Sequence, residues 1–299
     1  MEDRELAINR LSLSASWPTT QGRSAGLKVP GRFSERISCA FLLVVCLAAN
    51  PASAGADARF GYTDTPMLPG TPWHVHDINR PLPPVVDPGP ETSPLPPPSD
   101  AIVLFDGKDL SQWQDVKDKT LEGGVINVMT NGPIRTKREF GNCQLHIEWA
   151  TPGQPDGNAM NWGNSGVFLI DRYELQIIQT RIYADGISGA IYGQTPPLVT
   201  AARGAGQWQT FDVIFTAPAF SGGKLLRPAY FTVIWNGVLV QNHVAALGPT
   251  KHRELANYSD RTTRGPVTLQ SHNSNVRFRN IWIRPLGAEA TPQEPAEAK

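Results

Sequence analysis

Alternation of apolar and polar side chains is the dominant pattern from about residue 100 onward. In the clearest run, Tyr173–Gln179, alternate positions are apolar, and the positions between them carry Glu174 and Gln176. A period of two predicts a β-strand with one buried face. A second β-rich run, Val167–Ile170, is separated from the first by Asp171-Arg172, which is the length of a tight hairpin turn.

Similar short runs recur along the chain, and no segment has a convincing amphipathic helical pattern. The expected strands are Ile102–Phe105, Val125–Met129, Ile134–Thr136, Gln144–Trp149, Trp208–Phe215, Tyr230–Trp235, Val238–Gln241, Val267–His272 and Val276–Ile283. Many short strands separated by turn signals predict an all-β sandwich or jelly roll. We expect Leu145, Ile147, Leu175, Ile177, Leu269 and Phe278 to lie between two antiparallel sheets.

The chain before this domain falls into two parts. Residues 1–54 contain a 13-residue apolar run, Ile37–Ala49, followed by Ala52-Ser53-Ala54. This is the layout of a secretory signal peptide cleaved near Ala54, and the run is too short to span a membrane. We therefore expect a secreted or periplasmic protein.

Residues 55–100 form the second part, an extended segment called the strap below. Twelve of the 34 residues from Pro66 to Ser99 are proline, which excludes a helix or a sheet ladder. We expect Trp73 to dock on the domain. The run His74-Val75-His76-Asp77 could bind a metal ion, but packing is the favoured interpretation.

The folded domain is expected at 101–287, with a disordered tail at 288–299 that is rich in Ala, Glu and Pro. The 27 basic and 27 acidic side chains balance, which removes the electrostatic case for nucleic acid or an anionic membrane as a partner. Cys143 alone would remain after signal cleavage, so no internal disulfide is expected.

The polar faces of several predicted strands carry side chains suited to a sugar. If neighbouring strands direct them to one concave sheet, Glu148, Glu174, Gln176, Gln270, His272 and one Arg converge, with Trp162, Tyr192 and Trp208 beside them. Planar polar groups bind sugar hydroxyls, and aromatic faces bind the C–H surfaces. The sequence thus predicts a carbohydrate partner.

Six blocks of the sequence resemble the 3-keto-disaccharide hydrolase family. In order they are FDGKDLSQW, GNCQLHIEW, GNSGVFLIDRYELQ, GAIYGQTPPL, WQTFDVIF and LQSHNSNVRFRNIWIRPL. The resemblance covers about Ile102 to Leu286. It implies a concanavalin A-like jelly roll and cleavage of glycosides whose glucose has been oxidised at C3 by a separate dehydrogenase.

The chemistry implied by this resemblance assigns provisional roles. A ketone at C3 acidifies the C2 proton, so the site needs a base, a proton donor for the leaving oxygen, and groups that hold the enolate. Glu174 is the predicted base, with Glu148 or His272 as acid or second base. The predicted enolate and ligand contacts are Gln176, Gln270, Arg279, Arg135 and Asn164. No cofactor is certain, and a divalent metal ion at the enolate is left open.

Two other classes stay open on the residues alone. A conventional jelly-roll glucanase needs two nearby carboxylates, spaced on one strand as Glu-x-Asp-x-x-Glu. Here the run that begins at Glu174 has Gln176 and Gln179 at the later acidic positions, which argues against that class. A non-catalytic sugar-binding module would need the aromatic and amide groups but not the carboxylates.

Overall fold

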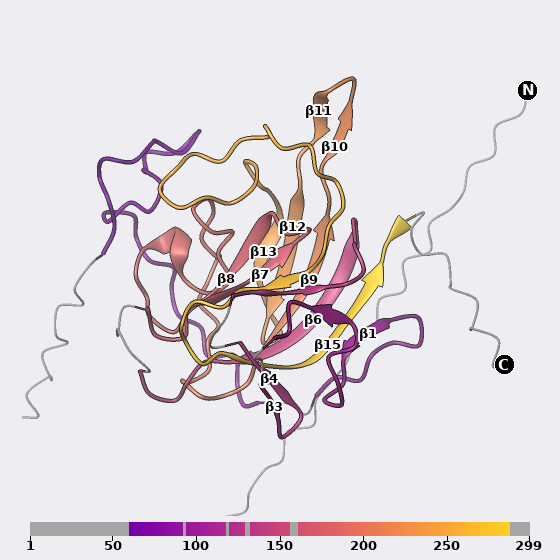
Figure 1. The fold of residues 1–299 in the computed structure, drawn as a ribbon. Coiled ribbons are helices and arrows are strands. Elements are labelled where there is room, and N and C mark those ends of the chain that lie inside the picture. The colour runs from indigo at the N-terminus through magenta and orange to yellow at the C-terminus, as the bar shows by residue number, and fades with distance from the viewer. Residues whose placement is uncertain (1–59, 92–93, 118–119, 129–131, 156–160, 288–299) are drawn as a thin grey trace, which may run out of the picture. The chain divides into compact units, whose positions relative to one another are not determined.

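Two antiparallel sheets pack face to face in the computed structural model, which describes residues 60–91, 94–117, 120–128, 132–155 and 161–287 (Figure 1). The larger, eight-stranded sheet has the order β13-β12-β9-β6-β15-β4-β3, and β1 also pairs with β15. The bounds of its strands are β1 Ile102–Phe105, β3 Thr120–Glu122, β4 Val125–Asn127, β6 Cys143–Ala150, β9 Gln209–Thr216, β12 Tyr230–Trp235, β13 Val238–Ala245 and β15 Arg277–Pro285.

The second sheet has five strands in the order β2-β5-β14-β7-β8. Their bounds are β2 Trp113–Gln114, β5 Ile134–Thr136, β7 Ser165–Leu169, β8 Tyr173–Ile177 and β14 Thr268–Leu269. The chain crosses between the sheets after β1, β2, β4, β5, β6, β8, β13 and β14, and such repeated crossing is typical of a jelly roll. The expected all-β jelly-roll sandwich is confirmed.

Four short features lie outside the predicted pattern. The strands β2 and β3 were not expected, nor was the hairpin of β10 (Ala219–Ser221) and β11 (Lys224–Arg227), which extends beyond the two sheets in Figure 1. A 3₁₀ turn, η2, spans Ala184–Gly186.

The core between the sheets is built from alternate positions of the predicted strands. All six residues expected there are fully buried and belong to one hydrophobic cluster: Leu145, Ile147, Leu175, Ile177, Leu269 and Phe278. The register explains this, because Leu175 pairs with Val167, which in turn pairs with Leu269. Each buried apolar side chain of this size contributes about 1.5–3 kcal/mol.

The same register sends the intervening residues to the outer face of the five-stranded sheet. Glu174 pairs with Phe168, and Gln176 pairs with Gly166. A slip of one residue would exchange the two faces, so the predicted orientation of Glu174 and Gln176 is confirmed by the burial of their neighbours.

The strap has no strand or helix within its described residues, 60–91 and 94–100, and makes only isolated bridges such as Val85 to Thr200. Its buried contact differs from the expected one. Trp73 is only partly buried, whereas Val75 and His76 are fully buried. The strap is therefore anchored by the residues that follow Trp73.

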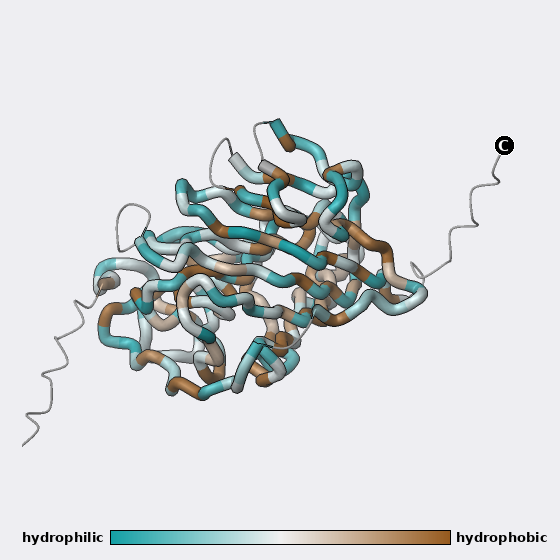
Figure 2. Tube along the Cα trace, turned by 90° about the horizontal axis from the view of Figure 1, so that it is seen from below, coloured by the Kyte–Doolittle hydropathy of each residue, from teal (hydrophilic) through white to brown (hydrophobic). Residues whose placement is uncertain are grey.

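Apolar and polar positions alternate along the described chain rather than gathering in one long apolar segment (Figure 2). Within the described residues, no helix is long and apolar enough to cross a membrane. The predicted signal peptide and the predicted C-terminal tail both lie outside the described residues.

Candidate active site

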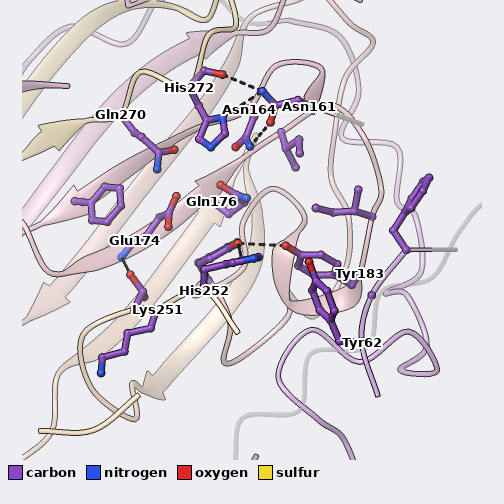
Figure 3. A pocket seen from close by; sticks show the side chains of 17 residues that line it. Tyr62, Asn161, Asn164, Glu174, Gln176, Tyr183, Lys251, His252, Gln270 and His272 are labelled. Carbon is purple, nitrogen blue, oxygen red and sulfur yellow. Dashed lines mark hydrogen bonds between the residues drawn. The ribbon is translucent and has the colours of Figure 1, made fainter. Parts of the chain in front are cut away.

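A cavity of about 940 Å³ lies over the outer face of the five-stranded sheet (Figure 3). It is lined by Phe60, Gly61, Tyr62, Asn161, Asn164, Phe168, Glu174, Gln176, Ile178, Ile182, Tyr183, Tyr192, Thr250, Lys251, His252, Gln270 and His272. The sheet forms its floor, and loops together with the start of the described strap form its walls. A volume of this size is at the upper end of the range for ligand pockets.

Glu174 is the carboxylate on the cavity floor. Its residue is only 5% exposed, and no hydrogen bond or ion pair joins its carboxylate to the described residues. Burial disfavours the charged form and raises the pKa of Glu174 to about 8. The carboxyl group is therefore poised to exchange a proton near neutral pH.

Gly166, opposite on β7, makes room for this carboxylate. A Cβ at position 166 would lie 2.4 Å from Oε1 of Glu174 and 2.9 Å from its Cγ. No real Cβ comes so close to another heavy atom, so any larger residue would displace the Glu174 side chain. The absence of a side chain at Gly166 thus helps to fix where the carboxylate lies.

Two carboxamides flank Glu174. Gln176 donates from Nε2 to the carbonyl of Gly186 at 3.2 Å, which holds its side chain against the 3₁₀ turn. Gln270 is fixed by its backbone, because its N–H donates to the carbonyl of Gly166 and its carbonyl accepts from the Ser165 hydroxyl. Figure 3 shows both amides beside Glu174. Amide N–H groups at this place can donate to sugar oxygens.

His272 is oriented by two asparagines. Nδ2 of Asn164 donates to Oδ1 of Asn161 at 2.6 Å, and Nδ2 of Asn161 donates to the backbone carbonyl of His272 at 2.9 Å. The same Asn161 nitrogen lies 3.2 Å from Nδ1 of His272. Asn164 lines the cavity and also supports His272 through Asn161.

An aromatic wall, made of Tyr62, Tyr183, Tyr192 and His252, lines one side of the cavity. Figure 3 shows Tyr62, Tyr183 and His252 on the side away from His272. The hydroxyl of Tyr192 lies 2.8 Å from Nδ1 of His252 and 3.2 Å from the hydroxyl of Tyr183. The guanidinium of Arg253 stacks 4.1 Å from the ring centre of Tyr62. Of this wall, sequence reasoning singled out only Tyr192.

His76 of the strap supports the aromatic wall from behind. It is fully buried, its Nδ1 lies 3.2 Å from Oδ1 of Asp185, and its backbone N–H donates to Oδ2 of the same residue at 3.0 Å. Its ring centre lies 4.2 Å from that of Tyr183 and 4.8 Å from that of Tyr192. The strap is thus a structural part of the cavity.

The predicted convergence of polar faces is correct for one sheet and wrong for the other. Glu174, Gln176, Gln270 and His272 meet at the cavity, but Glu148 and Arg279 do not line it. Glu148 lies on β6 and Arg279 on β15, and these strands pair with each other within the eight-stranded sheet. The alternation placed each side chain on the correct face of its own strand, but the two strands belong to the other layer.

Glu148 instead belongs to a buried polar network under the strap. Oε2 accepts from Nε of Arg279 at 2.6 Å, and Oε1 accepts from Nδ2 of Asn280 at 2.7 Å. Although burial opposes the change, hydrogen bonds from His146, Asn280 and Arg279 lower the pKa of Glu148. Burial also opposes the shift of His146, but hydrogen bonds to Asp212 and Glu148 raise its pKa to about 9.

Three other predicted contacts do not line the cavity. Arg135 lies on the same face of the five-stranded sheet, but its guanidinium is paired with Asp115 at 3.0 Å and Asp171 at 3.4 Å. Trp162 donates from Nε1 to the carbonyl of Pro152. The ring of Trp208 packs against the guanidinium of Arg279, 4.0 Å from the ring centre, on the side of the eight-stranded sheet.

Metal ligands do not gather in the part of the chain that the structure describes, where no group of three or more His, Cys, Asp or Glu side chains could hold an ion. His74 and His76 point to different partners, since Nδ1 of His74 contacts the carbonyl of Thr65 and Nδ1 of His76 contacts Asp185. The two histidines of the strap thus make separate contacts within the protein.

Comparisons with known proteins find similar solved structures. A solved structure of a protein from Parabacteroides distasonis, described provisionally as a glycosyl hydrolase, is 41% identical; the match covers 74% of this chain and 100% of that chain, with a TM-score of 0.61. Another protein from the same organism with the same provisional description is 22% identical and covers 62% of this chain and 99% of that one, with a TM-score of 0.45. No curated protein matches the chain.

The family comparison covers most of the sandwich. The family described as "3-keto-alpha-glucoside-1,2-lyase-like domain" matches residues 100–284, which is more than half of the chain and includes both sheets. This match and the 41% identical relative support an enzyme that acts on carbohydrate glycosides. The chain belongs to the 3-keto-disaccharide hydrolase family, as its sequence blocks indicated.

Proposed function

We propose that this protein cleaves the glycosidic bonds of 3-keto-glucosides, including 3-keto-disaccharides, by removing the proton on C2. The observation that carries the proposal is Glu174, the one carboxylate among the described residues that line the cavity. Its pKa of about 8 makes it a stronger base than an ordinary carboxylate when ionised. A base of this kind suits a proton that a neighbouring ketone has acidified.

The reaction begins when Glu174 takes the C2 proton. The C2–H electrons form a C2=C3 double bond, and the carbonyl pair moves onto the C3 oxygen. The enolate then re-forms C3=O, a C1=C2 double bond forms, and the C1–O bond breaks. The leaving oxygen takes up one proton, for which we propose His272 as the donor. Water then adds across C1=C2, with its hydroxyl on C1 and hydrogen on C2.

The neighbouring groups supply binding rather than covalent chemistry. Gln176 and Gln270 lie beside Glu174 on the cavity floor and present amide groups for the sugar hydroxyls and the enolate. The substrate must be made by a separate enzyme that oxidises the sugar at C3. The expected signal peptide would place the cleavage step outside the cytoplasm.

A two-carboxylate glucanase fits this cavity poorly. Such enzymes need two carboxyl groups about 5–10 Å apart. The described lining offers only Glu174, and Glu148 lies on the other sheet, in an ion pair with Arg279. A passive binding module fits poorly too, because an unpaired buried acid destabilises a fold without improving sugar binding.

An activity comparison tests the proposal. The protein should cleave a 3-keto-glucoside and leave the parent glucoside untouched, and it should exchange the C2 hydrogen with deuterated water. Glu174→Gln should lower turnover about 10²–10⁴-fold with little change in substrate affinity. In the wild type, kcat should fall as the pH drops below about 8, because the base must be ionised. Efficient cleavage of plain glucosides, or near-full activity of Glu174→Gln, would overturn the assignment.

A further inference from the structure

A chain of three side chains ends at the imidazole of His252. The hydroxyls of Tyr183 and Tyr192 lie 3.2 Å apart, and the Tyr192 hydroxyl lies 2.8 Å from Nδ1 of His252. Burial is the main cause that raises the pKa of Tyr183 and of Tyr192. Both phenols therefore keep their protons at any pH at which the enzyme works.

The chemistry of Tyr192 and His252 decides which of them donates the hydrogen bond between them. The unprotonated nitrogen of imidazole is a much stronger acceptor than a phenol oxygen, so the Tyr192 hydroxyl donates to Nδ1 of His252. The proton of the neutral ring then lies on Nε2. The imidazole is also held neutral, because burial and then the nearby His76, Arg253 and His272 lower its pKa.

The backbone ties this chain to Glu174. The N–H of Tyr192 donates to the carbonyl of Glu174 at 3.1 Å. The N–H of Glu174 donates to Oγ1 of Thr250 at 3.2 Å, two residues before His252. The negative charge of Glu174 contributes to the raised pKa of Tyr192, so the two side chains are electrostatically close. His252 and Glu174 consequently line one cavity in a fixed relation (Figure 3).

We propose that His252 is a catalytic residue that donates a hydrogen bond from Nε2 to the C3 oxygen of the substrate. This assignment rests on the proposed function. When Glu174 takes the C2 proton, the carbonyl electron pair moves onto that oxygen, and the neutral imidazole stabilises the charge without giving up its own proton. Tyr192 is a positioning residue, since it acts through Nδ1 of His252.

A neutral imidazole at His252 suits a site in which Glu174 acts as the base. An imidazolium beside Glu174 would favour the carboxylate and so weaken it as a base. A neutral imidazole donates to a developing oxyanion while leaving the basicity of the carboxylate intact, and enzymes that form enolates use this arrangement. His272 differs, because an asparagine rather than a buried phenol lies against its Nδ1.

Substitution at position 252 tests the role directly. His252→Ala should lower kcat and the rate of C2 exchange together by about 10²–10³-fold, the usual effect of losing one oxyanion donor, with little change in KM. His252→Gln keeps an N–H donor and should recover at least about tenfold of this loss. The control is His243→Ala, because His243 is exposed on β13, stacks on Tyr230 and does not line the cavity.

The nature of the leaving group separates this role from that of an acid. An enolate donor acts before the C1–O bond breaks, so His252→Ala should slow C2 exchange equally for nitrophenyl and alkyl 3-keto-glucosides. If the variant slows only the alkyl substrate and leaves exchange unchanged, His252 is an acid and the proposal is wrong. If the wild type shows no exchange at all, the proposed function itself fails.

A second readout needs no substrate. In ¹⁵N NMR of the full protein, His252 should show a protonated Nε2 and an unprotonated Nδ1 at neutral pH. Tyr192→Phe removes the hydroxyl that fixes this form, so it should give a mixture of tautomers and a lower kcat with a folded protein. A wild-type spectrum with the proton on Nδ1 would overturn the proposal, whatever the kinetics show.

Discussion

Glu174→Gln should make the protein more stable, and the gain should grow with pH. In the unfolded chain a glutamate loses its proton near its ordinary pKa of 4.5, whereas burial raises the pKa of Glu174 to about 8 in the folded state. The folded state therefore binds the proton more tightly. The stability that this tighter proton binding by Glu174 contributes is fully present below pH 4.5 and is lost as the pH rises from 4.5 to 8.

The size of the effect follows from the shift. A change of 3.5 pKa units, from 4.5 to 8, corresponds to about 5 kcal/mol at about 1.4 kcal/mol per unit. This is an upper limit, because water in the cavity solvates part of the carboxylate. Glutamine has no charge to bury, so the variant should match the wild type near pH 4.5 and exceed it by up to about 3 kcal/mol at pH 7.

Chemical denaturation of both proteins across this pH range measures the difference. Glu122→Gln is the matched control, because Glu122 is exposed at the turn between β3 and β4. Its replacement should leave the pH dependence of unfolding unchanged. A constant difference between Glu174→Gln and the wild type from about pH 5 to about pH 8.5 would refute the reasoning, since it would mean that the carboxyl group titrates alike in both states.

Three further substitutions probe the surroundings of the site. Gly166→Ala places a Cβ 2.4 Å from Oε1 of Glu174, so kcat should fall at least about tenfold while the far-UV CD spectrum stays unchanged. His76→Ala removes the ring nitrogen that contacts Oδ1 of the buried Asp185, while the backbone N–H of residue 76 still donates to Oδ2, so the free energy of unfolding should fall by about 1–3 kcal/mol in denaturant titrations. Glu148→Gln should lower the melting temperature but leave the rate of C2 exchange near the wild-type value.

Matched variants give these experiments their controls. Gly153→Ala adds a methyl group where nothing lies within 4 Å and should leave turnover unchanged. His74→Ala removes a partly buried histidine of the same strap and should cost much less stability than His76→Ala. Glu148 lies on the other sheet and cannot contact the substrate directly. Loss of C2 exchange in Glu148→Gln would therefore contradict its assignment to a structural network.

Alternation along a strand predicts which side chains share a face, and this part of the sequence reasoning holds for the strand of Glu174. Leu175 and Ile177 are buried in the core, and Glu174 and Gln176 face the cavity. The reason is local, because a period of two is a property of the extended backbone. The alternation is therefore the same whichever strands lie beside the strand in question.

Membership of a sheet is not local, and here the reasoning failed. Glu148 lies on a strand with the same alternation as the strand of Glu174, but β6 pairs with β9 and β15 in the opposite layer. In this jelly roll the chain often changes sheet from one strand to the next, so neighbours in sequence are often not neighbours in space. Pairing depends on long-range contacts that no single run of residues specifies.

The aromatic wall was largely missed because loops and the strap build it. His252 lies in a loop with no periodic pattern, and Tyr183 immediately precedes a single 3₁₀ turn. The two strap histidines were noticed, but a left-handed backbone at His76, with φ of 57°, turns them toward different partners. Only closure of the whole fold brings His76 and Asp185, which are 109 positions apart, into contact.

Two glutamates from similar strand patterns thus have opposite environments and opposite pKa shifts in this fold. Glu148 receives hydrogen bonds from Arg279 and Asn280, which together with His146 lower its pKa, so the charge is satisfied and serves stability. Glu174 has no partner among the described residues, faces a cavity, and has a pKa raised to about 8 by burial. An uncompensated carboxyl group destabilises the folded state. Taking a proton from the substrate would neutralise this carboxylate, which the fold leaves without a hydrogen-bond partner among the described residues. For this reason we place the chemistry at Glu174.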